Sequence, residues 1–173
     1  MPRGADFRME TSFSVTSVKD SGLSIGKKIY WKLYAVENFY RMIIHSILVA
    51  QIGPNWWSTA VDQTIQGKAH QFKQKYLKRP WHTLPGTHDI YYIDLTDLNE
   101  IVRANSNLFS YLIPDIHEWI VRVETLRLPR NVVAHMNFPN GIDEKRIDVV
   151  YEDFKNLVVS SLIPSSLNLQ IPS

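Results

Sequence analysis

The feature that most constrains the fold is a long amphipathic pattern between Ile25 and Ile52. Apolar residues recur there at alternating steps of four and three, which is the spacing of one face of an α-helix. They are Ile29, Leu33, Val36, Tyr40, Ile43 and Ile47. Gly53 and Pro54 follow, and both residue types are common just beyond helix ends. Such a helix would be roughly 40 Å long at 1.5 Å per residue, which suits a helical bundle better than a small mixed fold.

The middle of the chain also has helical patterns, interrupted by turn residues. Asn55 can cap a second helix that runs through the basic segment ending at Arg79, and the sequence PWHTLPGTH then stops it. The segment HDIYYIDL fits either a short strand or an extended connector, and a short helix is expected from about Thr96 to Ala104. One short strand does not make a sheet, so it does not alter the helical interpretation.

Two further helices are expected in the C-terminal half of the chain. Pro114 fits the first position of a helix that begins near Asp115, and Asp143 fits the cap of the last helix. The sequence therefore predicts an all-α fold with four main helices and one or two additional short helices.

Length and composition favour one cytoplasmic domain. At 173 residues the chain fits a single core, and we expect a flexible N-terminal arm over 1–24, a helical domain over 25–162 and a C-terminal tail over 163–173. The N-terminus is polar, and no run of 18 uncharged apolar residues follows it, so we expect a cytoplasmic protein that does not contact the membrane. The absence of cysteine excludes disulfides, thiolate metal sites and cysteine nucleophiles.

Charge is distributed unevenly, although the net charge is only +2. No acidic residue lies between Asp62 and Asp89, and seven acidic residues follow between Asp89 and Glu124. The acid-free interval contains Lys68, Lys73, Lys75, Lys78 and Arg79. Two explanations remain open: a solvated helix end whose cations suit the helix dipole, or a surface that binds a polyanion.

The stretch LPRNVVAH, Leu128–His135, places polar residues within an apolar helical run. On a helical wheel Arg130 lies within roughly 60° of the apolar positions of the same run, so its guanidinium points from an apolar face. Those positions are Trp119, Val123, Leu126 and Val133. A buried guanidinium needs a carboxylate or a bound anion, and Glu37 in the first helix is the candidate partner.

A polar stripe runs beside the apolar one and contains Glu124, Arg127, Asn131 and His135. Asn131 and His135 are about 40° apart and can act together, whereas Arg130 and His135 are about 140° apart on a straight helix. Arg130 and His135 can meet more easily if a second copy of the chain faces the first across a two-fold axis, so the geometry suggests a dimer. Pro129 removes a helical hydrogen bond and can kink the axis just before Arg130.

The stretch RNVVAH resembles the arginine, polar residue, three-residue spacer and histidine signature of the HEPN superfamily (higher eukaryote and prokaryote nucleotide-binding domains). The resemblance covers about Ile25–Leu162 and extends to other segments in the family's order. These are YAVENFYRMII followed by IGPNWW, a basic second helix, IYYIDLTDLNEIV and EWIVRVETLRLPRNVVAH. Pro129, directly before the motif arginine, departs from the family pattern.

This resemblance implies a four-helix up-and-down bundle that forms a homodimer, with the two motifs lining a shared cleft. Catalytic members of the family are metal-independent ribonucleases, so neither a metal nor another cofactor is expected. His135 would be the general acid or base, Arg130 would bind the scissile phosphate, and Asn131 would orient either group. Glu37 would hold Arg130, and the product would carry a 2′,3′-cyclic phosphate.

The resemblance also implies supporting and RNA-binding residues. Arg41 and Arg127 would support the site or bind the RNA backbone. Contacts with RNA phosphates, independent of the RNA sequence, would come from Lys73, Lys75, Lys78 and Arg79. Free-standing bacterial members of the family often resemble toxins or abortive-infection proteins, so an antitoxin or a defence-system protein is a plausible partner.

Alternatives to catalysis remain open. The second hypothesis is a non-catalytic HEPN dimer that binds RNA, a nucleotide or a partner protein. The third is a helical dimerisation module in which Arg130 only pairs with Glu37. A metal site on the loop containing His82, His88 and Asp89 has little support, because their spacing matches no familiar ligand pattern. Neither GxSxG nor a P-loop is present, so acyl transfer and nucleoside triphosphate hydrolysis lack local support.

Overall fold

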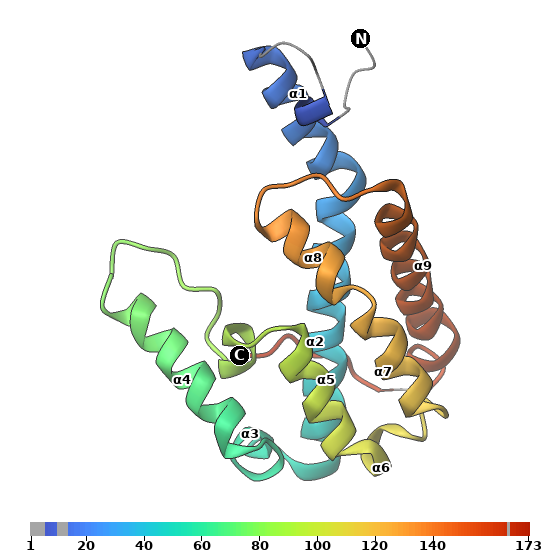
Figure 1. The fold of residues 1–173 in the computed structure, drawn as a ribbon. Coiled ribbons are helices and arrows are strands. Elements are labelled where there is room, and N and C mark those ends of the chain that lie inside the picture. The colour runs from blue at the N-terminus through green and yellow to red at the C-terminus, as the bar shows by residue number, and fades with distance from the viewer. Residues whose placement is uncertain (1–5, 10–13, 166) are drawn as a thin grey trace.

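The computed structural model describes residues 6–9, 14–165 and 167–173, and every regular element within them is helical (Figure 1). The prediction of an all-α bundle with additional short helices is confirmed. The elements are η1 (Phe7–Met9), α1 (Val15–Ile25), η2 (Gly26–Tyr30), α2 (Trp31–Ile52), α3 (Trp56–Ala60), α4 (Gln63–Leu77), η3 (Asp89–Tyr92), α5 (Leu95–Ala104), α6 (Ser106–Phe109), α7 (Ile116–Glu124), α8 (Arg127–Ala134), α9 (Gly141–Leu157) and η4 (Val158–Leu162). Among them η1 and η3 are 3-10 turns, while η2 and η4 are π-helical.

The long helix α2 is the centre of the bundle. It packs against α5 and α9, α5 packs against α7, and α8 packs against α9. The longer helices alternate in direction along the chain, from α2 through α4, α5 and α7 to α9 (Figure 1). Helix α5 was expected only as a minor element, but it packs against α2 and α7 within the bundle. Helix α4 packs mainly against η3, at the side of the bundle.

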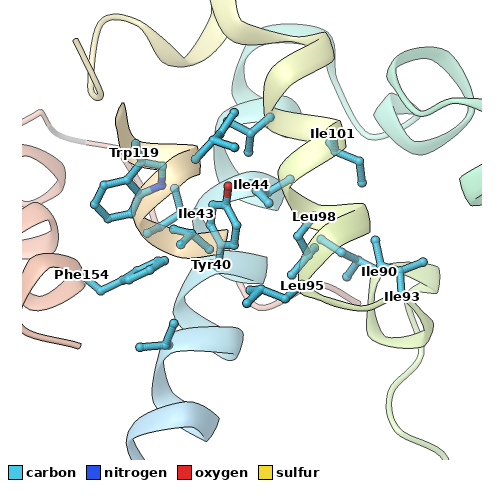
Figure 2. Close-up of a cluster of buried hydrophobic side chains, with 14 of the residues drawn as sticks. Tyr40, Ile43, Ile44, Ile90, Ile93, Leu95, Leu98, Ile101, Trp119 and Phe154 are labelled. Carbon is cyan, nitrogen blue, oxygen red and sulfur yellow. The ribbon is translucent and has the colours of Figure 1, made fainter. Parts of the chain in front are cut away.

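The hydrophobic core forms around the apolar face of α2 (Figure 2). All six residues of the predicted stripe are buried, with exposed fractions of 0 to 6%. Tyr40 meets Phe154 of α9 with ring centroids 5.5 Å apart, and Trp119 of α7 meets the same ring at 4.7 Å. Helices α2 and α7 therefore converge on Phe154 of α9, and edge or tilted ring contacts of this kind add to the stability gained from burial.

Both ends of the chain contain described residues that are helical or that pack on the core. Residues 15–24 are helical in α1, which is capped by Ser14 and continues through η2 into α2, while residues 1–5 and 10–13 of the expected arm lie outside the described part. The residues that α1 buries are the serines Ser21 and Ser24 rather than apolar side chains. In the tail, Gln170 N–H donates to Ser46 Oγ at 2.8 Å, and Leu167 and Leu169 pack on the core.

Several helix ends lie at other residues than expected. The second helix divides into α3 and α4, and Asp62 caps α4 by accepting from the N–H of Thr64 at 2.8 Å. The segment that contains Asp89–Tyr92 is a 3-10 turn rather than a strand. Asn140, not Asp143, caps α9, because its Oδ1 accepts two backbone N–H groups at 2.9 Å. Short polar side chains occur at neighbouring positions in these segments, and the pattern alone does not choose among them.

A cluster of aromatic rings joins α2, α3 and η3. His45 Nδ1 accepts from Trp56 Nε1 at 3.2 Å, and His88 stacks on Trp56 with centroids 5.2 Å apart. His88 Nδ1 also accepts the N–H of Ile90 at 3.1 Å. Burial lowers the pKa of His45, and burial together with the neighbouring His45 lowers the pKa of His88 to about 4. Both imidazoles therefore favour the neutral, hydrogen-bond-accepting form.

We predict that the free energy of unfolding decreases as pH falls from about 6.5 to about 4. The unfolded chain protonates His88 near its ordinary pKa of 6.5, whereas the folded chain resists protonation until about pH 4. Allowing for the partial exposure of His88, this group contributes about 2 kcal/mol across that interval. Urea unfolding at several pH values should show a smaller decrease for His88→Asn, which keeps an acceptor for the Ile90 N–H but cannot titrate.

The replacement His82→Asn on the exposed neighbouring loop is the matched control. If the stability difference between wild type and His88→Asn stays constant from pH 7.5 to pH 4.5, this explanation of acid sensitivity is wrong.

Candidate functional site

The motif helix α8 is separate from α7, because the helix is interrupted at Thr125 and Leu126. The prediction of one continuous helix from Trp119 to His135 is therefore wrong. A proline ring clashes with the carbonyl four residues earlier in a helix, and for Pro129 that carbonyl belongs to Thr125. In the structure Pro129 is the third residue of α8, and backbone nitrogens in the first turn of a helix have no acceptor within that helix. The lack of an N–H at Pro129 therefore costs no hydrogen bond, and the next residue, Arg130, donates its N–H to Leu126 O at 2.8 Å.

The C-terminal end of α8 fixes the position of His135. His135 is the C-cap, and Met136 follows in the left-handed region with φ of 59°. Met136 N–H donates to Val133 O at 2.9 Å, and Asn137 N–H donates to Val132 O at 3.0 Å. This pair of hydrogen bonds is the Schellman motif, which turns the chain sharply at a helix end. His135 consequently lies at the exposed corner between α8 and the following loop.

Glu37 in α2 binds two arginines through one oxygen. Its Oε1 accepts from Arg41 at 3.2 Å and from Arg130 of α8 at 3.4 Å, so the expected contact between Glu37 and Arg130 is present. Arg41 also donates to the carbonyls of Ile90 and Ile93, each at 3.3 Å. The side chain of Arg41 is 11% exposed and that of Arg130 is 34% exposed. Arg41 is thus a structural cross-link, whereas Arg130 keeps an accessible face.

These three charged residues line a cavity of about 670 Å³ between α1, α2 and α8. Rings from separate segments form much of its wall: Phe7, Tyr30, Tyr34, Tyr91 and Phe138. Further apolar wall comes from Val18, Ile25, Leu33, Val133 and Met136. A charged cluster at the edge of an apolar cavity is the usual composition of a small-molecule site.

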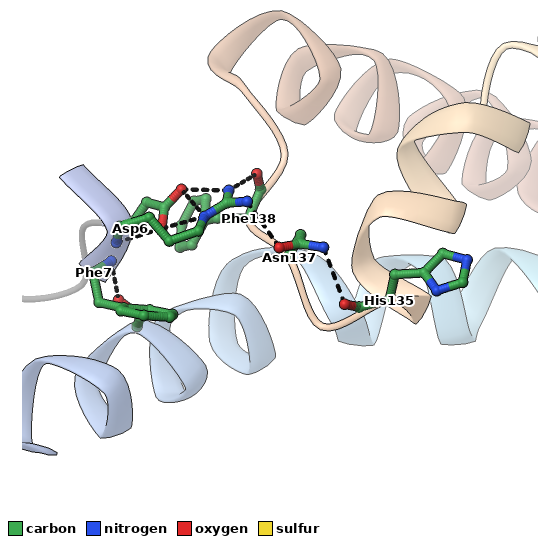
Figure 3. A network of polar contacts seen from close by, with 7 residues as sticks. Asp6, Phe7, His135, Asn137 and Phe138 are labelled. Atoms are coloured by element: carbon green, nitrogen blue, oxygen red, sulfur yellow. Dashed lines mark hydrogen bonds and ion pairs between the residues drawn. The ribbon is translucent and has the colours of Figure 1, made fainter.

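The other predicted site residues lie outside this cavity. Asn131 and His135 are exposed and do not line it, and the His135 imidazole points away from Phe7 and Phe138 (Figure 3). Arg127 Nε donates to Glu124 Oε1 at 2.5 Å, at the joint between α7 and α8. Within one protomer, therefore, the structure brings Arg130, Glu37 and Arg41 together and leaves Asn131, His135 and Arg127 apart from them.

The basic cluster at the end of α4 is only partly available. Lys73 donates to Asp89 at 2.7 Å and to Thr87 O at 2.9 Å, which ties α4 to the loop before η3. Lys68 similarly pairs with Asp97 of α5 at 2.7 Å. Lys75, Lys78 and Arg79 are exposed and form no ion pair with any residue that the structure describes, while Lys68 is paired but its side chain is still 59% exposed. Two lysines of the basic block therefore form ion pairs with aspartates of the acidic block, and these pairs reduce the positive charge of this surface.

Sequence reasoning missed the aromatic wall and the turn that closes it. Tyr30, Tyr34, Glu37 and Arg41 follow helical spacing and could have been recognised as one functional face. Arg8 carried no such signal, yet its guanidinium donates to Asn137 Oδ1 at 2.8 Å and to Phe138 O at 3.3 Å, just beyond His135 (Figure 3).

The described residues form neither a three-ligand metal cluster nor a helix that could span a membrane. In residues 6–9, 14–165 and 167–173, no three His, Cys, Asp or Glu side chains are grouped so that they could hold a metal ion. His88 stacks on Trp56, and Asp89 pairs with Lys73. Within the same ranges no helix has both the length and the apolarity required to span a bilayer.

No family model, curated protein or solved structure matches the chain. The family resemblance consequently rests on the motifs and their order in the sequence.

We predict that Glu37→Gln destabilises the fold, because it leaves the buried Arg41 without a counter-charge. The free energy of unfolding should decrease by about 2–4 kcal/mol, as for other buried ion pairs that lose one partner. Urea unfolding would measure this decrease. The control Glu152→Gln, which breaks the exposed pair with Lys155, should leave the midpoint nearly unchanged. Equal effects of the two replacements would contradict the structural importance of Glu37.

Proposed function

We propose that the protein is a HEPN-type endoribonuclease that cleaves RNA without a metal ion and acts as a homodimer. The observation that carries the proposal is the arrangement of α8. Arg130 is held by Glu37 yet remains one-third exposed, and His135 stands at the exposed end of the same eight-residue helix. A candidate phosphate-binding cation and a side chain that can transfer a proton are thus carried by a single short element, and they face different sides of it.

The chemistry requires only groups that the RNA and this helix supply. The 2′-hydroxyl oxygen attacks the adjacent phosphorus and loses its proton to a base, and the bond from phosphorus to the 5′-oxygen breaks as that oxygen receives a proton. The products are a 2′,3′-cyclic phosphate and a free 5′-hydroxyl. His135 would transfer these protons, because an imidazole can both accept and donate a proton. Arg130 would bind the phosphate and stabilise its developing charge, and Asn131 would orient the imidazole.

A dimer resolves the separation of these groups within one protomer. The His135 imidazole points away from the cavity that Arg130 lines, so the Arg130 of one copy and the His135 of another form the simplest complete site. The exposed cations Lys75, Lys78 and Arg79 would add phosphate contacts whose strength decreases with salt. A cytoplasmic toxin or phage-defence effector, paired with an antitoxin or another defence protein, is the context that this activity fits.

A second candidate function is non-catalytic binding of RNA, a nucleotide or a partner protein by a HEPN dimer. The observation that favours it is the position of the cavity, which includes Arg130 but not His135. In this case Arg130 would contribute to binding, and the exposed histidine would have no catalytic part.

We predict that the wild-type protein cleaves a mixed RNA pool in the presence of EDTA and leaves 2′,3′-cyclic phosphate ends. Arg130→Ala and His135→Ala should each decrease the rate by at least about 100-fold. Arg146→Ala and His117→Ala are matched controls, because these residues are exposed on other helices, and they should cleave normally. RNA that stays intact with the wild type, or is cut equally well by the Arg130 and His135 variants, would refute the ribonuclease proposal.

We also predict that mixing two inactive variants restores activity if the site is shared between protomers. When Arg130→Ala and His135→Ala are unfolded together and refolded, half of the dimers are mixed, and each mixed dimer has one complete site. About a quarter of the wild-type activity should return. If each site lies within one protomer, the mixture should stay as inactive as the separate variants.

A further inference from the structure

The cavity beside α8 has properties that RNA cleavage does not require. We propose that it binds a small organic anion, with a ring-sized apolar body held by the aromatic wall and a single anionic group held by Arg130. The shared chemistry is an apolar carboxylate, sulfonate or phosphate of low molecular mass. This inference goes beyond the proposed ribonuclease function, because it uses neither His135 nor a second protomer.

The size and origin of the cavity support a preformed small-molecule site. Its volume of about 670 Å³ lies in the range that accommodates ordinary organic ligands. Its wall combines η1, α1, η2, α2, the region around η3 and α8. Six places along the chain therefore contribute to the wall of one partly open cavity, which distinguishes it from a groove between two neighbouring helices.

The aromatic wall identifies the body of the ligand. Tyr30 at the end of η2 and Tyr34 in the first turn of α2 are 57% and 62% exposed, so both rings remain accessible. Phe7, Tyr91 and Phe138 add rings from other segments. Aromatic side chains of this kind contact planar and aliphatic groups through the ring and water through the hydroxyl. An apolar body of one or two rings would cover them.

The charges identify the head group. Asp6 and Arg8 pair with each other, and Glu37 carries one negative charge for both Arg41 and Arg130. The cavity wall therefore has an excess of one positive charge. Arg41 is nearly buried by Glu37 and two carbonyls, so the accessible positive group is Arg130. A charge-assisted hydrogen bond to an anion fits this guanidinium.

The N-terminal turn, which lines the cavity, forms hydrogen bonds with α1 on one side and with the segment after His135 on the other (Figure 3). Phe7 N–H donates to Ser21 Oγ of α1 at 2.9 Å, while Arg8 donates to Asn137 and Phe138 beyond α8. The turn thus bridges the two walls and places the Phe7 ring against the cavity. Such a connection retains a ligand longer than an open surface would.

A fluorescent probe with the required chemistry tests the proposal. The anionic dye 8-anilinonaphthalene-1-sulfonate should bind the full-length native protein saturably at one site, with a dissociation constant of about 1–50 μM. Arg130→Gln should weaken its binding about 10-fold, because a charge-assisted hydrogen bond is lost. The uncharged analogue N-phenyl-1-naphthylamine should bind wild type and Arg130→Gln within about 2-fold of each other, since it lacks the sulfonate.

A space-filling variant tests the location. Gly22 lines the cavity, and a Cβ atom there would meet nothing within 4 Å, so Gly22→Phe places a ring in the space without a clash at the backbone. It should abolish binding of both dyes. Gly67→Phe on α4 has an equally open position outside the cavity and should bind like wild type. Near-ultraviolet circular dichroism verifies native packing, and Gly26→Phe replaces Gly22→Phe if the latter fails to fold.

Two results would overturn the proposal: dye binding that does not saturate, or equal binding by wild type and the folded cavity-filling variant. His135→Ala should bind the dye normally while losing RNA cleavage. Failure of cleavage in the wild type would therefore count against the ribonuclease proposal alone, and failure of dye binding would count against the cavity proposal alone.

Discussion

The shared carboxylate of Glu37 is the interaction on which the arrangement around the site depends. It lies on the central helix, neutralises the nearly buried Arg41 and reaches Arg130 on α8. Arg41 in turn satisfies the carbonyls of Ile90 and Ile93, two acceptors in the connection that leads into α5. One negative charge therefore allows a guanidinium to replace water at buried backbone groups and orients a second guanidinium toward a cavity.

Most of the bundle could be predicted from the sequence, because burial of one helix face produces a periodic pattern. The stripe from Ile29 to Ile47 is buried as expected, and the apolar phase of Arg130 correctly indicated a carboxylate partner. Pro129 is a local cause of the break between α7 and α8. The apolar periodicity continues across this break, and for that reason it predicted one continuous helix. The cavity could not be foreseen, since Phe7 and Phe138 meet there only through the tertiary fold.

The two halves of the motif occupy different environments. Arg130 faces an apolar cavity and a fixed counter-ion, whereas Asn131 and His135 face solvent. The turn at Met136 keeps this separation, because both backbone hydrogen bonds of the helix end depend on its left-handed conformation. In the proposed ribonuclease the phosphate-binding and proton-transferring groups would thus lie on different sides of one short helix, and a complete site would have to combine both surfaces.

The shortness of α8 has a consequence for motion. The helix has eight residues, and only Pro129 and Val133 among them are buried. A segment with so little buried area opens locally at a free-energy cost well below that of global unfolding, and its amide protons exchange with solvent early. The long helix α2, which carries ten buried residues, belongs to the slowly exchanging part of the molecule. The motif is therefore carried by an element with little buried area, which Glu37 joins to the well-buried central helix.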